Sequence, residues 1–338
     1  MSSIALIDIA KSWGVSTALH AVNLQIEPGS FCVLLGPSGC GKSTTLRIVA
    51  GLETATAGQV LIDGRDVTSL PPARRGIAMV FQNYALFPHL SVADNITFGL
   101  SVRKVPATET ALRLRNAADL LGLGALLERK PGQLSGGQQQ RVALGRALVA
   151  QAQVCLMDEP LSNLDAQLRQ EMRRELRELQ RQLGLTVVYV THDQAEAMSM
   201  ADQVVLLNQG RVEQAGMPRD LYAKPSTTFS ARFIGTPPMN LVALEGGRIA
   251  GSDTDAGLQA ATLGVRPEAI ALDPQGIPAT VQSVEYLGAD LVLNCRIGTQ
   301  SLLVRADGRH HADAGDHVGL RWAREDAHGF DAAGKRIH

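Results

Sequence analysis

Short apolar runs alternate with helical stripes along the first two thirds of the chain. Buried strands are predicted at FCVLL (31–35), VCLM (154–157) and TVVYV (186–190), where nearly every side chain is apolar or aromatic. Runs of this length and composition are typical of central strands in a parallel sheet. The segment VVLLNQGRVEQAG (204–216) instead predicts a hairpin with its turn near Gly210.

Helical spacing is clearest in residues 165–183. The apolar positions there are Leu168, Met172, Leu176, Leu179 and Leu183. Steps of three and four residues place them on one face of a helix, and Arg, Glu and Gln cover the other face. A second helical zone, at about 109–127, is expected to be broken by Pro131-Gly132. This alternation predicts an α/β domain with a largely parallel sheet.

The pattern changes around FIGTPPMN (233–240). The residues that follow are rich in Gly, Val and Asp, form short alternating runs, and show no helical periodicity. We therefore expect a first domain at 1–235 and a small β-barrel-like domain at 236–338, with the adjacent prolines 237–238 as a hinge.

Composition and charge narrow the class of protein. The 338 residues are too many for one compact core, and 45% apolar and 19% charged residues are ordinary for a globular protein. A net charge of −1 gives no field to attract nucleic acid, so none is expected as a partner. No apolar run is long enough to span a membrane, no signal peptide is recognisable, and the four cysteines are scattered. These features predict a soluble cytoplasmic protein with free thiols.

The segment GPSGCGKS (36–43) fits the pattern G-x-x-x-x-G-K-[ST] in full, between an apolar run and a helical pattern. Glycines let backbone N–H groups turn toward phosphate oxygens, and the helix N-terminus adds positive charge. Lys42 can reach the β and γ phosphates, and the Ser43 hydroxyl can bind Mg²⁺. The expected nucleotide-binding residues are Gly36, Pro37, Ser38, Gly39, Cys40, Gly41, Lys42, Ser43 and Thr44. The alternative is a chance glycine turn.

A pair of carboxylates ends the strand predicted at VCLMDE (154–159). Asp158 can hold Mg²⁺ through water, and Glu159 is placed to orient or deprotonate an attacking water. Such a pair is often only a polar strand end. Together with the phosphate loop upstream, it predicts a protein that binds a nucleoside triphosphate.

The segment LSGGQQQR (134–141) resembles the signature motif of ATP-binding-cassette (ABC) ATPases. Ser135, Gly136 and Gly137 open a predicted helix whose N-terminus can bind an anion, although an isolated S-G-G is usually a helix cap or linker. The resemblance implies that these residues and Gln138 contact ATP held by a second copy of the chain. One phosphate loop and one signature per chain then require a head-to-tail dimer with two shared sites.

Three further segments match the family residue by residue. Gln82 resembles the glutamine that reaches Mg²⁺ and the attacking water and senses the permease. SNLD, which ends in Asp165, resembles the loop that crosses the dimer interface beside ATP. His192 in YVTHD resembles the histidine that contacts the γ-phosphate, and its alternative reading is a polar strand end. The implied catalytic residues are Lys42, Gln82, Glu159 and His192, and the implied metal ligands are Ser43, Gln82 and Asp158.

The side chains of Trp13 and Cys40 each have two possible roles. Trp13 takes the place of the aromatic residue, commonly Tyr, that stacks on adenine, but it could be a surface anchor. Because Cys40 lies within the phosphate loop, modification of its thiol is predicted to impair nucleotide binding. The alternative is that Cys40 is only a small residue that fills space in the loop. The resemblance covers about 4–235 and implies a P-loop cassette with a RecA-like core and a helical subdomain at about 85–150.

The segment GVRPEAI (264–270) resembles the G-x-R-P-E signature of the OB-type regulatory (TOBE) domain that follows importer cassettes, although such a segment can be a simple turn. The resemblance implies an importer ATPase that binds ATP and Mg²⁺ and sits peripherally on the cytoplasmic face of the membrane. Its implied partners are two permease subunits and, indirectly, a periplasmic solute-binding protein.

The segment FIGTPPMNL (233–241) resembles the carbohydrate-importer ATPases, which include those for maltose-type sugars and for sn-glycerol 3-phosphate, the nearest fit. Other segments also resemble polyamine, ferric-ion and phosphonate importers. Two further alternatives stay open. The chain could be a soluble ABC ATPase without a permease, and the second domain could sense a ligand or an inhibitor.

Overall fold

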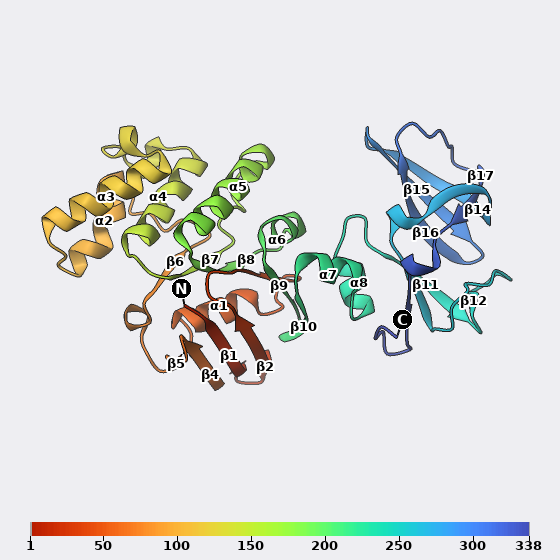
Figure 1. Cartoon of the computed structure of the whole chain (residues 1–338), viewed down its shortest axis with the longest axis horizontal. Helices are drawn as coiled ribbons and strands as arrows, with labels where there is room; N and C mark the ends of the chain where they lie inside the picture. The colour runs from red at the N-terminus through yellow and green to blue at the C-terminus, as the bar shows by residue number, and fades with distance from the viewer. Residues whose placement is uncertain (1, 338) are drawn as a thin grey trace. The chain divides into compact units, whose positions relative to one another are not determined.

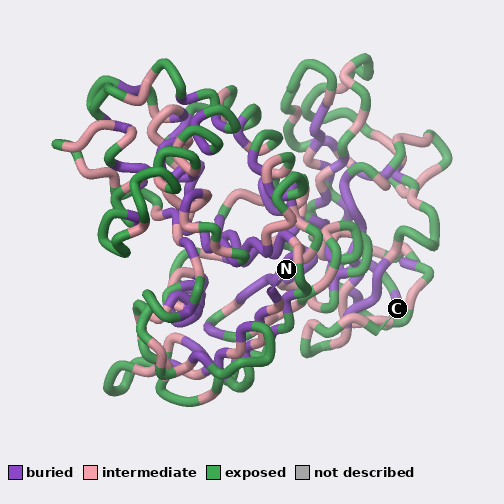
Figure 2. Tube along the Cα trace, turned by 60° about the vertical axis from the view of Figure 1, so that its left-hand side comes forward, coloured by how far each residue is buried: buried purple, intermediate pink, exposed green. Residues whose placement is uncertain are grey.

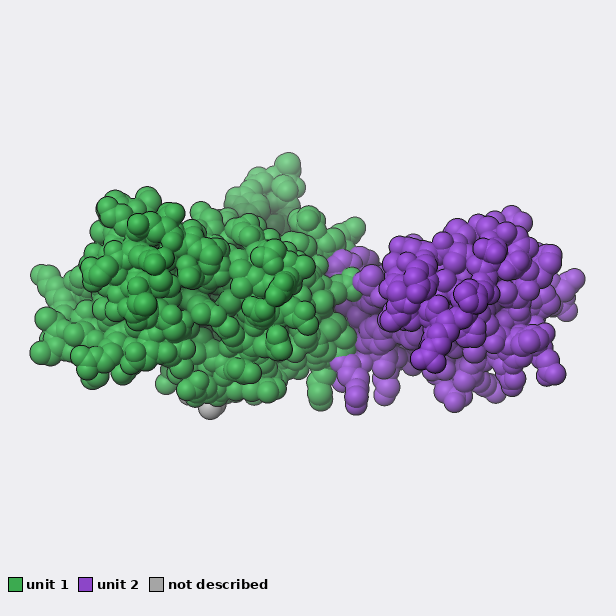
Figure 3. All heavy atoms as spheres, turned by 90° about the horizontal axis from the view of Figure 1, so that it is seen from above, with its two compact units in different colours: residues 1–218 green, residues 219–338 purple. Residues whose placement is uncertain are grey.

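The computed structural model describes residues 2–337 and separates into two compact units, Met1–Pro218 and Arg219–His338, coloured separately in Figure 3. The boundary predicted after residue 235 lies inside the second unit. Buried stretches alternate with exposed segments along the whole trace (Figure 2). No helix within residues 2–337 combines the length and apolarity needed to cross a membrane.

A six-stranded sheet forms the centre of the first unit (Figure 1). In spatial order its strands are β10 (Arg211–Gly216), β9 (Gln203–Asn208), β3 (Phe31–Leu35), β8 (Thr186–Val190), β7 (Val154–Asp158) and β6 (Ile77–Val80). Every neighbouring pair is parallel except β9 and β10, which form the predicted hairpin. β3, β7 and β8 are buried along their full length, which confirms the three strands predicted from apolar runs.

The first unit also contains a second sheet, which the sequence pattern did not reveal. All strand pairs in this sheet are antiparallel. Its strands, in spatial order, are β2 (Ser16–Ile26), β1 (Ile4–Trp13), β4 (Ala57–Ile62) and β5 (Arg65–Asp66). Apolar side chains of both sheets and of helix α1 (Lys42–Ala50) share one core. That core holds the strand, loop and helix that carry the phosphate-binding segment in one rigid body.

Besides α1, the first unit contains α2 (Val92–Val102), α3 (Ala107–Leu121), α4 (Gly136–Val149), α5 (Ala166–Leu183) and α6 (Gln194–Met200). Of these, α2, α3 and α4 pack together (Figure 1). The predicted helix at 165–183 is confirmed. Its Asp165 caps α5, because Oδ1 accepts a hydrogen bond of 3.0 Å from Leu168 N. The helix predicted at 109–127 ends earlier than expected. Gly122, with φ of 64°, closes α3 in the left-handed conformation well before Pro131.

The second unit begins within the short helix α7 (Pro218–Ala223), which a second short helix, α8 (Thr228–Phe233), follows. It continues as two antiparallel four-stranded sheets, which confirms an all-β region. One sheet contains β12 (Arg248–Ile249), β11 (Asn240–Glu245), β13 (Thr262–Val265) and β18 (Ala327–Phe330). The other contains β16 (Gln300–Asp307), β15 (Asp290–Ile297), β14 (Ala271–Tyr286) and β17 (His317–Arg321). A core of buried residues from both sheets lies between them.

Arg266 of the predicted RPE signature joins the two short helices to this β region. Its buried guanidinium donates hydrogen bonds to the carbonyls of Tyr222 (2.8 Å), Ala231 (3.3 Å) and Ile234. It also lies 4.0 Å from the centre of the Tyr222 ring. These contacts explain why residues 219–235 belong to the second compact unit.

Candidate nucleotide site

The phosphate loop leaves the end of β3 and enters α1. Gly36 and Gly41 have φ of 149° and 105°, which L side chains rarely adopt. A Cβ atom on Gly36 would overlap the carbonyl oxygen of Leu207, and one on Gly41 would lie 2.5 Å from Leu19 Cδ2. Neighbouring strands therefore confine the loop so closely that only glycine fits at these two positions.

The Lys42 side chain lies under the loop and is 6% exposed. Its Nζ donates hydrogen bonds to Gly36 O at 2.8 Å and Pro37 O at 2.9 Å. The first N–H groups of α1, which starts at Lys42, have no carbonyl partner within the helix. The loop thus brings an ammonium group and the positive end of a helix together, as phosphate binding requires. Pro37, Ser38 and Gly39 form its more exposed rim, and Ser43 and Thr44 lie in the first turn of α1.

Ser43 and Asp158 meet at the base of the loop. Ser43 Oγ donates a hydrogen bond of 3.0 Å to Asp158 Oδ1, and the carboxylate is largely buried at the end of β7. Mg²⁺ prefers oxygen ligands and is commonly held by one or two carboxylates together with substrate phosphates. One hydroxyl and one carboxylate beside a phosphate loop fit that ion, although residues 2–337 contain no cluster of three or more His, Cys, Asp or Glu arranged for a metal.

Glu159 and His192 face each other from neighbouring strand ends. His192 Nδ1 lies 3.1 Å from Glu159 Oε2. Glu159 has a positive φ of 45°, and its N–H donates a hydrogen bond of 3.0 Å to Val190 O at the end of β8. Strain at a non-glycine residue persists where surrounding contacts enforce it, and it is common at functional sites.

Gln82 belongs to a connected set of loop residues beside Glu159. Its Nε2 donates to Ser162 Oγ at 3.4 Å, and its carbonyl accepts from Asn163 Nδ2 at 3.0 Å. Ser162 Oγ in turn donates to Glu159 O at 2.9 Å. The structure thus joins Gln82 to the loop that contains Asp165, and it places the Gln82 amide on Ser162, not on Ser43 or Asp158.

The signature segment forms the start of α4. Ser135 is the N-cap, with Gln138 N donating to Ser135 Oγ at 3.4 Å and Ser135 N donating to Gln138 Oε1 at 3.0 Å. Gly136 and Gly137 occupy the first turn. In the described part of the chain, no hydrogen bond joins this segment to the phosphate loop.

Trp13 and Cys40 have contrasting environments. Trp13 is 49% exposed at the end of β1, with Lys11 Nζ 5.1 Å from the ring centre, which leaves ring surface open for stacking. Cys40 is buried, and burial raises the pKa of its thiol although Lys42 lies near and lowers it. A buried thiol that keeps its proton favours the filler interpretation of Cys40.

A buried hydrogen-bond network lies behind His192, and it was not predicted from the sequence. Glu196, only 3% exposed, accepts hydrogen bonds from Tyr189 and Thr191, the hydroxyl-bearing residues that precede the histidine. The only signal available was a pair of hydroxyl-bearing residues, Tyr189 within the strand and Thr191 just after it, followed by a carboxylate in the next helix.

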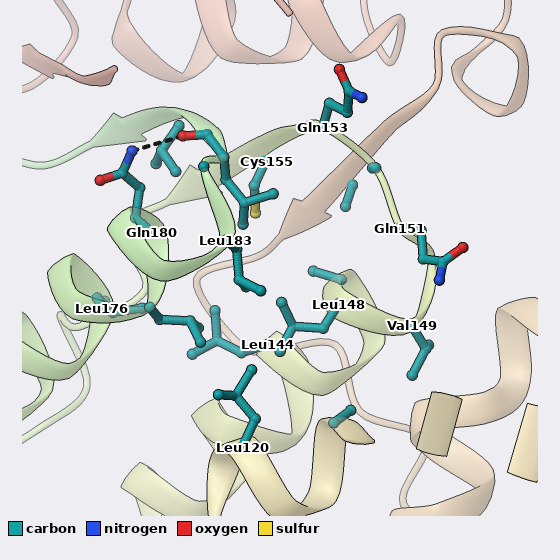
Figure 4. A pocket seen from close by; sticks show the side chains of 18 of the residues that line it. Leu120, Leu144, Leu148, Val149, Gln151, Gln153, Cys155, Leu176, Gln180 and Leu183 are labelled. Carbon is teal, nitrogen blue, oxygen red and sulfur yellow. Dashed lines mark hydrogen bonds between the residues drawn. The ribbon is translucent and has the colours of Figure 1, made fainter. Parts of the chain in front are cut away.

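A separate cavity of about 370 Å³ lies between α3, α4, α5 and the β6–β7–β8 edge (Figure 4). Leu120, Leu144, Leu176 and Leu183 point into it, and Gln180 beside it donates a hydrogen bond to the Leu185 carbonyl. The apolar stripe predicted on the 165–183 helix contributes to this lining. No residue of the phosphate loop lines it, so it is not the candidate nucleotide site.

The glycine loop between a buried strand and a helix, the buried Lys42, and the Ser43–Asp158 pair define a P-loop nucleoside triphosphatase. The profile of the ABC transporter family matches residues 19–162, and that of the TOBE domain matches residues 263–330. The chain therefore carries an ABC-type ATP-binding cassette followed by a TOBE domain.

Curated relatives match along the whole chain. The chain is 51% identical to the sn-glycerol-3-phosphate import ATP-binding protein UgpC of Ruegeria pomeroyi, over 100% of this chain and 99% of that protein. Proteins of the same name from Chromohalobacter salexigens and Cupriavidus necator are 50% and 47% identical, over 95% and 100% of this chain and 92% and 100% of theirs.

A solved structure of the ATP-binding cassette MJ0796, a post-hydrolysis dimer bound to ADP and Pi, matches with a TM-score of 0.57 and 33% identity. The match covers 64% of this chain and 99% of that one. The chain belongs to the ABC transporter family of import ATP-binding proteins, and it is an ATP-binding ATPase coupled to transport.

Proposed function

We propose that this chain is the ATP-hydrolysing subunit of an importer for sn-glycerol 3-phosphate or a related carbohydrate. The observation that carries the substrate class is the 51% identity to an import protein named for sn-glycerol 3-phosphate over essentially both full lengths. The chain's own residues support the ATPase step, since solute contacts lie on other proteins of such a system.

The phosphate loop binds the triphosphate. Lys42 exchanges a carbonyl partner for the β and γ phosphates, and the N–H groups at the start of α1 donate to phosphate oxygens. Trp13 stacks on the adenine ring. Ser43 and Asp158, with Gln82 after a side-chain movement away from Ser162, would hold Mg²⁺, which would neutralise negative charge on the phosphates.

Glu159 is the general base in this proposal, because its carboxylate stands at the end of β7 immediately after Asp158. His192 keeps that carboxylate oriented through the 3.1 Å contact and contacts the γ-phosphate with its exposed ring. Phosphoryl transfer depends mainly on positioning and electrostatic stabilisation, which these groups provide.

A second copy completes the site. Ser135, Gly136, Gly137 and Gln138 lie at a helix N-terminus suited to an anion but are not joined to the phosphate loop of their own chain. In a head-to-tail dimer they would face the γ-phosphate bound by the partner, near Asp165, and closure would move permease loops docked close to Gln82. The related cassette MJ0796 is dimeric in its solved structure, which supports this arrangement.

The remaining partners follow from the importer assignment. Two permease subunits would anchor the ATPase dimer to the cytoplasmic face of the cell membrane, and a periplasmic solute-binding protein would act through them. The TOBE region, residues 263–330, would have a regulatory role.

Uptake by a strain that lacks this chain tests the proposal. Labelled sn-glycerol 3-phosphate, a disaccharide, putrescine and ferric iron are offered in parallel. Loss of sn-glycerol 3-phosphate or disaccharide uptake, restored by the wild-type chain but not by Lys42→Ala, is the expected result. Loss of only putrescine or iron uptake would overturn the substrate class but keep the ATPase assignment, and unchanged uptake of all four would contradict the importer assignment.

A further inference from the structure

We infer that Glu196 is a positioning residue for ATP hydrolysis: it fixes the segment 191–193 so that His192 meets Glu159. The inference rests on the proposed roles of His192 and Glu159. Glu196 itself lies behind the site in α6 and touches neither of them through a hydrogen bond recorded among residues 2–337.

One carboxylate oxygen of Glu196 binds the segment that carries His192. Glu196 Oε2 accepts hydrogen bonds from Thr191 Oγ1 at 2.6 Å and from Tyr189 Oη at 2.8 Å. Thr191 Oγ1 also accepts from Asp193 N at 3.0 Å. The carboxylate therefore holds Thr191 directly, and it holds Asp193 through the Thr191 hydroxyl.

His192 has few contacts of its own. Its side chain is 62% exposed, so packing does little to hold it at 3.1 Å from Glu159. The adjoining residues are anchored instead. Thr191 N donates to Leu34 O at 3.2 Å, just before the phosphate loop, and Asp193 Oδ1 accepts from Ala195 N at 2.7 Å. The position of His192 is therefore set by the anchored residues on either side of it.

The burial of Glu196 strengthens the hydrogen bonds that its carboxylate accepts. Hydrogen bonds to a buried carboxylate are stronger than bonds between neutral groups and rigidify what they join. Burial raises the pKa of Glu196, and the nearby Asp193 also raises it, whereas the Thr191 and Tyr189 hydrogen bonds and Arg173 lower it. Removing the carboxylate leaves two buried hydroxyls without their acceptor, so they turn to other partners and the segment moves.

The first test compares Glu196→Ala with Glu196→Gln in steady-state ATP hydrolysis. We expect Glu196→Ala to lower kcat by about 10- to 100-fold, since a displacement of about 1 Å can cost that much, with KM for ATP changed less than about threefold. Glu196→Gln should keep kcat within about threefold, because an amide oxygen can still accept both hydroxyls.

Gln180→Ala is the matched control. Gln180 is equally buried and donates hydrogen bonds to Gly29 O and Leu185 O, away from His192. It should lower the melting temperature without lowering kcat of the folded enzyme. Equal losses of kcat in Gln180→Ala and Glu196→Ala would overturn the inference. If Glu196→Ala does not fold, Thr191→Val takes its place with the same expected loss.

The second test repeats Glu196→Ala in a His192→Ala background. If Glu196 acts through His192, it should change the residual kcat by less than about twofold there. An undiminished loss in that background would overturn the inference. Wild-type turnover in Glu159→Gln and His192→Ala would instead overturn the proposed site, whereas wild-type turnover in Glu196→Ala alone overturns only the positioning role.

Discussion

His192 Nδ1 and Glu159 Oε2 lie 3.1 Å apart at the ends of two neighbouring parallel strands. The strands themselves hold this pair, since Glu159 N donates to Val190 O, two residues before His192. A carboxylate with a fixed partner next to a phosphate loop has the geometry needed to orient a water molecule.

Replacing Glu159 with Gln should abolish turnover while leaving nucleotide binding intact. The amide has nearly the same shape but cannot take a proton, so we expect kcat to fall by about 100-fold or more. ATP should then accumulate in a closed dimer, which size-exclusion chromatography with ATP would detect. Hydrolysis at the wild-type rate would show that Glu159 is not the base.

Cys40 should resist alkylation at neutral pH. Burial raises the pKa of its thiol, so little thiolate is present at pH 7 and more forms as the pH rises. N-ethylmaleimide should therefore inactivate ATP binding slowly at pH 7 and faster at pH 9. Rapid inactivation at pH 7 in the wild type, absent from Cys40→Ala, would instead restore the interpretation of Cys40 as a reactive thiol.

Arg266 should stabilise the second unit without serving the ATPase step. Arg266→Met leaves three carbonyls without their donor and should lower the free energy of unfolding of residues 219–338 by about 3 kcal/mol. Calorimetry of the full chain would measure this. Arg248→Met, which removes an exposed ion pair with Asp253, is the control and should change stability by less than about 0.5 kcal/mol. An equal effect of both variants would contradict the structural role of Arg266.

The Glu196 carboxyl should give stability a particular pH dependence. Burial raises its pKa in the folded state above about 4.3, the value of an unfolded glutamate. Between these two values the folded state binds more protons, so the contribution of Glu196 to stability is present below the unfolded pKa and is lost as the pH rises through the folded pKa.

Glu196→Gln removes that titration. The unfolding free energy of the wild type minus that of Glu196→Gln should therefore fall as the pH rises upward from about 4.3. Urea titrations at several pH values would measure the difference. A difference that grows with pH would mean that the folded pKa is lowered.

Much of the first unit could be predicted because its signals are local. The runs 31–35 and 186–190 match their strands to the residue, and the stripe at 165–183 matches α5. The end of α3 was missed because Leu and Ala continue past Gly122, where the left-handed backbone stops the helix. The antiparallel sheet of β1, β2, β4 and β5 was missed for two reasons: register shifts interrupt the pairing of β1 with β2, and the pairing of β1 with β4 joins segments separated by the phosphate loop and α1.

For the candidate site, the residues were predicted from the sequence, but the contacts between them were not. Glycines 36 and 41 are recognisable by their spacing, yet their close approach to Leu207 and Leu19 depends on tertiary packing. The attachment of residues 219–235 to the second unit through Arg266 is likewise a long-range effect. Hydrogen bonds from Tyr189 and Thr191 to Glu196 could not be inferred from the pattern of polar and apolar positions alone.

The most direct measurement is ATP hydrolysis by a mixture of two inactive variants, Lys42→Ala and Ser135→Arg. A dimer of either variant alone has a defect in both shared sites. A mixed dimer has both defects in one site and none in the other, because each site combines Lys42 of one copy with Ser135 of the other. An equimolar mixture should regain up to about a quarter of the wild-type rate, because about half of the dimers are mixed and each has one intact site. No recovery, with mixed dimers shown to form, would contradict an ATP site shared between two copies of the chain.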